Sequence, residues 1–368
     1  MRRGLIAHSR VELPDAVFDA RMERLRAAMA GLDALLVYTN NTRPAGVSWL
    51  VGFIPYWSEA MLVLPRTGAP VLVVALTFRV KPWIERTSRV AEIVFTPRIG
   101  IETARLVAAK KADAVVGVVD FDSLSAGIAD DLREAGPHLA FTDSSALFAA
   151  LRAVADPAEI MLTARASSIA ASALSHIDPG EPRIDAIVAA VEGEARRLGA
   201  EEVYVAAAPD LARDRRLVRI DGATAGEPAR GTRFAVRASV AYKGSWVRRV
   251  VTIDRDLTAH TEEAAAAFAE AVARLPSDRT LSQFASYVVE GCRLAQPLEA
   301  LMGSRIAAPR PPSPGAIVSV QACIETDGRP VLLGAPALLG AAGEAASAFL
   351  YQPVGLSGSL THQICWRN

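Results

Sequence analysis

The alternation of apolar and polar segments over residues 1–150 predicts an α/β domain. A helix is indicated at 21–29, because Met22, Leu25 and Met29 recur at three- and four-residue spacing. Short apolar runs rich in branched side chains then predict strands at 34–38, 60–64, 71–76, 91–95 and 114–119. The second and third of these runs are separated by Pro-Arg-Thr-Gly-Ala-Pro, a hairpin type of connection. We therefore expect a mixed sheet in this part of the chain.

The pattern changes at residues 151–160, where Asp156 and Pro157 can begin a helix as N-cap and first helical residue. That helix is expected to run through His176. A second helix follows, with apolar residues at a 3.6-residue period that ends before Gly199. Strands are then predicted at 201–208, 233–242 and 245–253, helices at 261–275 and 281–294, and strands at 316–325 and 330–339.

This order of helix, helix and strands occurs twice, which predicts two related halves around one sheet. The expected division is an N-terminal α/β domain over residues 1–150 and a second α/β domain over residues 151–368.

Charge and composition narrow the classes of partner. The chain of 368 residues has 40 basic and 40 acidic side chains, so no net positive field favours nucleic acid or an anionic membrane. Only four of the basic residues are lysine, which together with the abundant alanine indicates a GC-rich genome. An arginine at any one position is therefore weak evidence of function.

The three cysteines, Cys292, Cys323 and Cys365, have no C-x-x-C spacing and predict a reducing compartment. We expect no signal peptide, because Glu12 and Asp15 precede any long apolar run. We also expect no membrane span, since no apolar stretch approaches the ~20 residues that a span needs. A cytoplasmic location follows as the expectation.

Several segments, taken in order, resemble the creatinase, aminopeptidase P and prolidase family. The segment "RMERLRAAMAGLDALLVYTNNTRPAGVSWLVGF" is similar to the family's opening helix and strand, and "MLVLPRTGAPVLVV" to the hairpin after it. The linker "LRAVADPAEIMLTARAS" is similar to the start of the family's catalytic domain. The resemblance implies a creatinase-type N-terminal domain followed by a pita-bread domain.

Metalloenzymes of this family hold two divalent ions with two aspartates, one histidine and two glutamates, and carboxylates of this kind suit Mn²⁺-like ions. The resemblance aligns "VRASVAYKGSWVRRVVT" with the strands that carry both aspartates, anchored on Tyr242 and Gly244. Arg237 then stands at the first aspartate and Arg248, eleven residues on, at the second.

The other family ligands also have no counterpart in this alignment. Met302 stands at the ligand histidine, Pro309 and Arg310 at a His-Glu pair, and Gln321 and Gly334 at the two glutamates. Two arginines in place of two aspartates would repel cations. We therefore expect no metal and no other cofactor.

Arg237, Arg248 and Arg310 are candidates for an anion site, because guanidinium groups suit carboxylate and phosphate. The alternative is drift in an arginine-rich sequence, with these side chains turned to solvent. Tyr242, Trp246 and Gln321 are further candidate substrate-binding residues, although Tyr242 is also expected as a core residue.

Cys323 shares a strand face with Gln321, but no histidine is placed beside it as a base, so an inert buried thiol is expected. His362 lies in the tail "SGSLTHQICWRN" and is expected at the surface, or folded over a pocket.

Two functions from different classes remain open at this point. One is a metal-independent hydrolase, lyase or cyclase that acts on a small carboxylate-bearing compound. The family does contain metal-free enzymes, creatinase and ectoine hydrolase, but this chain lacks the histidine that they use. The other function is a non-catalytic pseudopeptidase used for ligand binding or assembly, and a misaligned metallopeptidase is the remaining possibility. The resemblance also implies a homodimer.

Overall fold

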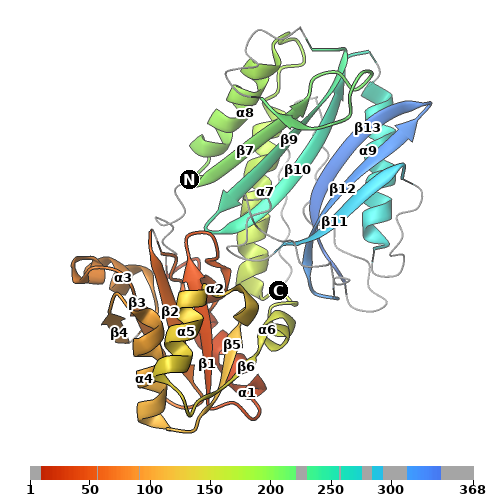
Figure 1. Cartoon of the computed structure of the whole chain (residues 1–368). Helices are drawn as coiled ribbons and strands as arrows, with labels where there is room; N and C mark the ends of the chain where they lie inside the picture. Colours follow the sequence, from red (N-terminus) through yellow and green to blue (C-terminus); the bar gives the residue numbers. More distant parts are fainter. Residues whose placement is uncertain are drawn as a thin grey trace.

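The computed structural model describes residues 10–55, 57–90, 92–220, 230–256, 258–275, 284–292 and 313–340. Two sheets dominate this part of the chain, one of six strands and one of seven (Figure 1). The predicted α/β fold class with a mixed N-terminal sheet is confirmed. The predicted division at residue 150 lies within the helix Ser145–Leu151, beyond the last strand of the first sheet.

The first sheet has the strand order β4-β3-β2-β1-β5-β6. Strand β1 pairs antiparallel with β2 and parallel with β5, so the sheet is mixed. Its strands are β1 (Ala34–Asn40), β2 (Glu59–Pro65), β3 (Val71–Val74), β4 (Glu92–Phe95), β5 (Val115–Val119) and β6 (Ala140–Asp143).

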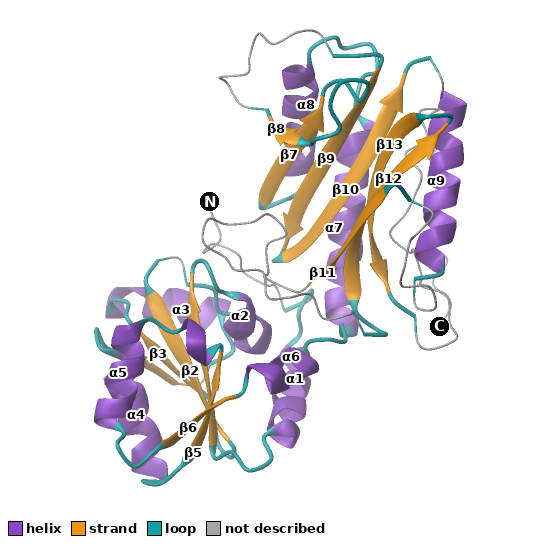
Figure 2. Ribbon diagram, turned by 45° about the vertical axis from the view of Figure 1, so that its right-hand side comes forward, coloured by secondary structure: helices purple, strands orange, loops and turns teal. Residues whose placement is uncertain are grey.

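Helices cover both faces of this sheet (Figure 2). One apolar cluster joins one face to α1 (Asp15–Ala28), α2 (Ala45–Val51), α3 (Lys81–Thr87) and α6 (Ser145–Leu151). Another joins the opposite face to α4 (Ile99–Lys110) and α5 (Ala126–Ala135). Both clusters are built from the branched residues whose runs predicted the strands.

Helix α7 (Pro157–Ser175) leads from the first sheet to the second. Asp156 is its N-cap, and a capping box joins the Asp156 side chain to the backbone of Glu159 and the Glu159 side chain to the backbone of Asp156. Pro157 occupies the first turn, where its missing N–H costs no hydrogen bond. The predicted start of this helix is confirmed.

The second sheet has the order β11-β12-β13-β10-β9-β7-β8, and its neighbouring strands are antiparallel in every pair. Helices α7, α8 (Ile184–Arg197) and α9 (Thr258–Ala273) lie behind it in Figure 1. Its strands are β7 (Glu202–Ala208), β8 (Val218–Arg219), β9 (Arg233–Tyr242), β10 (Ser245–Asp254), β11 (Ser286–Cys292), β12 (Ile317–Thr326) and β13 (Arg329–Leu338).

One predicted element is wrong. The segment 281–294 was expected to be helical, but Ser286–Cys292 forms the edge strand β11, which pairs with β12. Tyr287, Val288 and Val289 give this segment a β-branched and aromatic run that fits a pleated surface better than a helix. The doubled order of helices expected from the sequence is therefore broken at this point.

Candidate functional site

The second sheet has two unlike faces. Val236, Val240 and Val247 belong to the apolar cluster formed with α7 and α8, while Val318 and Val331 belong to the cluster formed with α9. We call the opposite side of the sheet the distal face. It is defined by Arg237 and Ser239 on β9, Trp246 and Arg248 on β10, Ser319 and Gln321 on β12, and Glu290 on β11.

The strand register places both candidate arginines on the distal face. Arg248 is paired with Ser239, and Ser239 lies two residues after Arg237. Because cross-strand partners and residues two apart share a face, Arg237 and Arg248 lie on one side of the sheet. The turn at Lys243 and Gly244, both with positive φ, joins β9 to β10 as predicted and sets this register.

Gln321 and Trp246 also lie on the distal face. Across the strands, Gln321 pairs with Gly334 and Gly334 pairs with Val250. Val250 in turn pairs with Arg237, so all four residues share one face. Trp246 lies two residues before Arg248 and is buried, and its ring stacks on Tyr204 with the centroids 5.8 Å apart. Four of the six candidate residues therefore share one face.

Arg248 is buried on this face and has an acidic partner. Its side chain is 7% exposed, and its Nη1 donates to Oε2 of Glu290, whose side chain is 33% exposed. Its Nε lies 3.4 Å from the hydroxyl of Ser239, a long hydrogen bond. A buried guanidinium needs such partners, since an uncompensated charge in the interior is costly.

The other side chains of the distal face form a polar region beside an apolar one. Arg237 and Gln321 are half-buried. Next to Arg237 in the register, Val250 belongs to a separate apolar cluster on this face; its other buried members are Ala208, Leu211, Ala235, Cys323 and Leu332. The distal face thus joins a guanidinium region to an apolar one.

Tyr242 does not belong to this group. It lies five residues after Arg237, so its side chain faces the helices, where it packs against the core. Its hydroxyl donates to Oε1 of Glu12 at 2.6 Å, and this hydrogen bond, together with burial, raises the pKa of Tyr242. The guanidinium of Arg165 lies 5.8 Å from the ring centroid. Tyr242 therefore links the N-terminal segment to the second sheet.

Of the remaining positions singled out in the sequence, the structure describes Gly334. Gly334 lies in β13, and a Cβ built there would stand 2.8 Å from Cγ2 of Val250 and 3.1 Å from Cγ of Gln321. A glutamate at this position would need both neighbours to move. Arg310, Met302, Pro309 and His362 lie outside the described residues.

The distal-face residues do not fit a divalent cation. Guanidinium groups have no lone pair to donate, and amide and hydroxyl oxygens are weak substitutes for carboxylates. In the described ranges, no three histidine, cysteine, aspartate or glutamate side chains are grouped so that they could hold a metal ion. Glu290 is the carboxylate beside Arg248, and it is already in an ion pair.

Cys323 fits the expectation of an inert thiol. It is 5% exposed, and burial raises the pKa of its thiol. The nearby Arg215 lowers that pKa in part, but its guanidinium also donates to Glu325 at 2.7 Å. A protonated thiol is a poor nucleophile.

Sequence reasoning missed three distal-face residues: Glu290, Ser239 and Ser319. Glu290 was assigned to a helix and so was never placed on the sheet. Ser319 is fully buried, lies opposite Glu290 in the register, and its Oγ has no hydrogen-bond partner within the part of the chain that the structure describes. The signal for Glu290 was the β-branched and aromatic run Tyr287-Val288-Val289 directly before it, which favours a strand.

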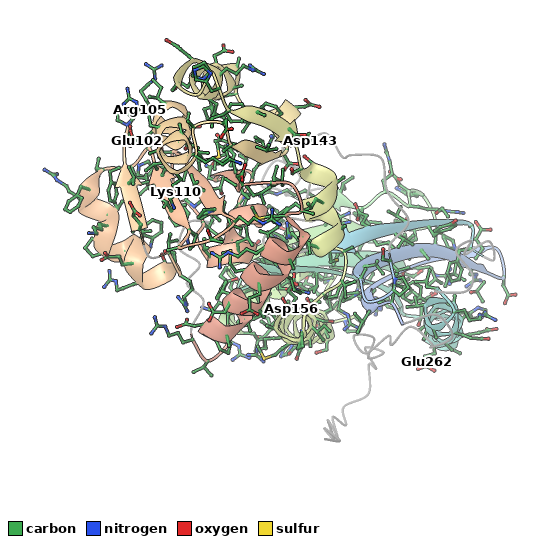
Figure 3. The ribbon with its side chains drawn as sticks, turned by 90° about the horizontal axis from the view of Figure 1, so that it is seen from below. Glu102, Arg105, Lys110, Asp143, Asp156 and Glu262 are labelled. Atoms are coloured by element: carbon green, nitrogen blue, oxygen red, sulfur yellow. The ribbon has the colours of Figure 1, made fainter. Side chains whose placement is uncertain are left out.

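A second buried arginine lies where the two parts of the chain meet. Arg21 on α1 is 1% exposed, and it donates from Nε to Asp156 Oδ2 at 2.6 Å and from Nη1 to the carbonyl of Trp49 at 2.8 Å. Trp49 in turn donates to Glu159 at 3.2 Å. Figure 3 labels Asp156 between α1 and the start of α7. This network joins the first sheet's helices to the second domain.

The pKa values of the two carboxyl groups at this junction are shifted in opposite directions. Burial raises the pKa of Asp156, but the hydrogen bond and charge of Arg21 outweigh burial and hold it below its usual value. Burial, helped by the charge of Asp156, raises the pKa of Glu159.

Comparison with known proteins supports the fold of both parts. Residues 21–154 match the model of the Creatinase/Prolidase N-terminal domain. No curated protein matches the sequence. The predicted resemblance to the creatinase and prolidase family is confirmed.

Solved structures resemble nearly the whole chain. An Xaa-Pro dipeptidase from Bacillus anthracis is 20% identical with a TM-score of 0.65, covering 91% of this chain and 98% of its own. An X-Pro aminopeptidase from Thermotoga maritima MSB8 is 15% identical with a TM-score of 0.64, covering 88% and 96%. A prolidase from Pyrococcus horikoshii OT3 is 14% identical with a TM-score of 0.62, covering 89% and 97%. At these identities the likeness establishes the fold.

None of the helices in the described ranges has the length and apolar character that crossing a membrane requires.

Proposed function

We propose that the distal face binds a small carboxylate-bearing compound without a divalent metal. The chain that carries this face has the fold of the Xaa-Pro dipeptidases and a creatinase/prolidase N-terminal domain. The observation that carries this proposal is that Arg237 and Arg248 share one face, with Arg248 buried and already paired to a carboxylate. A guanidinium oriented for one carboxylate is suited to another.

The surroundings of Arg248 support a small organic ligand. Arg237, Gln321 and Glu290 are each partly exposed, so they give a ligand polar contacts at the edge of a buried charge. The apolar cluster around Val250 continues from this region along the same face. A compound with a carboxylate and a short apolar body could contact Arg248 and the apolar cluster around Val250 together.

Calorimetric titration of succinate into protein treated with EDTA tests this proposal. We expect saturable binding to the native chain and its loss in Arg248→Ala, with both proteins folded by circular dichroism. Arg216→Ala is the matched control, because Arg216 is an exposed arginine that pairs with Asp214 on a loop. Equal binding by the native chain and Arg248→Ala would refute the proposal.

Elemental analysis of protein purified without chelator tests the metal-free part. We expect no stoichiometric divalent metal. We also expect no cleavage of Xaa-Pro dipeptides with added Mn²⁺, although relatives of this fold are named for that substrate class. Two tightly held ions per chain would overturn this part of the proposal.

A metal-independent enzyme is the second candidate, and Glu290 favours it. A partly exposed carboxylate beside a guanidinium is a group that can accept or donate a proton next to a bound carboxylate. A hydrolase, lyase or cyclase would lose turnover in Glu290→Gln while it kept ligand binding. Turnover that is unaffected by this substitution would remove Glu290 from the chemistry.

We further propose a cytoplasmic homodimer that does not bind nucleic acid. The balanced charge supports the last point, and the exposed Phe78 and Trp57 add apolar surface near the first sheet. Sedimentation at micromolar concentration should give twice the chain mass of 39.0 kDa. A species at the chain mass alone would contradict the dimer.

A further inference from the structure

The partner of Arg248 comes from a strand that is not its neighbour. Glu290 lies on β11, and the sheet order places β13 and β12 between it and β10. The pairing of β10 with β13 is limited to Val250 and Gly334. The ion pair therefore joins two strands that are not paired with each other in the sheet, and it is not a ladder contact.

Glu290 is held less firmly than Arg248. Its side chain is 33% exposed, against 7% for Arg248, and β11 is the last strand of the sheet in the described ranges. The neighbouring Tyr287 and Val288 are 40% and 51% exposed. A carboxylate on such an edge can be hydrated if it leaves the guanidinium, whereas the buried guanidinium cannot.

An exchange of carboxylates keeps Arg248 paired throughout. A ligand carboxylate can accept the hydrogen bonds that Glu290 accepts, and the freed Glu290 regains water. The hydroxyl of Ser319, buried opposite Glu290 and without a partner in the described ranges, adds a donor at the same place. A neutral ligand cannot make this exchange, because it would leave the guanidinium uncompensated.

We propose that Glu290 is a built-in competitor of the ligand, occupying on Arg248 the position that the ligand carboxylate takes. This proposal rests on the proposed function and adds a specificity device to it. Only a compound with a carboxylate that outcompetes Glu290 binds, and the affinity of simple carboxylates is kept low by the internal one.

Titration of succinate into matched variants tests the exchange. Glu290→Gln removes the competing charge and keeps the shape, so succinate should bind about tenfold more tightly, the value of one charge-assisted hydrogen bond of modest strength. Glu325→Gln is the control, because Glu325 on β12 forms an Arg–Glu pair with Arg215, which precedes β8, and lies further along β12 than Ser319, the partner of Glu290 in the register. It should leave the affinity unchanged.

Three outcomes are distinguishable. Tighter binding by Glu290→Gln alone supports the exchange, and Ser319→Ala should then weaken succinate binding in that background. Equal affinities of the native chain and Glu290→Gln, or weaker binding by the variant, overturn the competitor and leave the proposed function standing. Absence of binding by both proteins, each shown to be folded by its thermal transition, overturns the proposed function itself and the competitor with it.

Discussion

Two buried arginines, Arg21 at the junction and Arg248 on the distal face, have nearly the same exposure and quite different surroundings. Arg21 has a partner carboxylate that is 12% exposed, and its guanidinium carbon lies 5.5 and 5.2 Å from the ring centroids of Phe18 and Trp49. Arg248 has a partner that is 33% exposed and a long contact to Ser239. The surroundings of Arg21 therefore keep it paired with Asp156, whereas the partner of Arg248, Glu290, can be exchanged for another carboxylate.

The carboxylates differ in the same way. Asp156 receives Arg21 on Oδ2 and the Glu159 amide on Oδ1 at 3.0 Å, so one side chain both caps α7 and neutralises a buried charge. Glu290, by contrast, lies on an edge strand and pairs with Arg248. A buried ion pair is weak evidence for function by itself. The contrast in partner burial is what separates a structural arginine from a candidate binding arginine.

The largest effect is expected from Arg21→Met. It leaves Asp156 buried without its guanidinium, which should lower the free energy of unfolding by about 3 to 5 kcal/mol. Urea denaturation measures this. Arg24→Met is the control, since Arg24 is 43% exposed and 4.0 Å from the same carboxylate, and it should cost less than about 1 kcal/mol. Equal effects of the two substitutions would contradict the structural role of Arg21.

The second effect is a pH dependence at another contact region, near the turn between β9 and β10. Burial raises the pKa of Glu201 to about 7, although the amides of Lys243 and Gly244 act in the opposite direction. Its contribution to stability is therefore present below the unfolded pKa of 4.5 and is lost as the pH rises through about 7.

Glu201→Gln isolates this contribution. Relative to the variant, the native chain should lose on the order of 2 kcal/mol of unfolding free energy between pH 4.5 and pH 8. Denaturation at several pH values measures the difference, with the exposed helix residue Glu262, labelled in Figure 3, changed to Gln as the control. A difference that does not change with pH would contradict a raised pKa.

Arg248→Ala should destabilise less than Arg21→Met, by about 1 to 2 kcal/mol, because the released Glu290 can be hydrated. The same substitution should abolish succinate binding without unfolding the protein. Chemical denaturation and calorimetry on one preparation give both quantities. A loss of stability as large as that of Arg21→Met would make Arg248 a structural residue too and remove the distinction between the two sites.

The smallest effect is expected from Glu325→Gln, whose pair with Arg215 has both side chains more than 40% exposed. It should change the free energy of unfolding by less than about 1 kcal/mol, since water screens exposed pairs. A larger change would mean that the exposure of an ion pair does not predict how much it contributes to the free energy of unfolding.

Much of the fold follows from sequence pattern, because branched apolar runs and the Asp156-Pro157 start encode local structure. The shared face of Arg237 and Arg248 also follows, since a two-residue turn at Lys243 and Gly244 fixes the register. The opposite orientation of Tyr242 could have been derived from its odd spacing to Arg237.

Other features depend on tertiary contacts that no local pattern encodes. The segment around Glu290 forms an edge strand because β12 offers it a partner, and its short run is compatible with helix or strand. The hydrogen bond from Tyr242 to Glu12 joins residues that are 230 positions apart. The alignment that identified the arginines therefore could not identify the acidic side chain that pairs with one of them.

A crystal structure of the chain grown with succinate and EDTA tests the central claim most directly. The account predicts a succinate carboxylate at hydrogen-bond distance from the Arg248 guanidinium on the distal face, with Glu290 moved away from it. Succinate absent from this face at saturating concentration, or bound elsewhere while the Arg248–Glu290 pair stays intact, would contradict the claim.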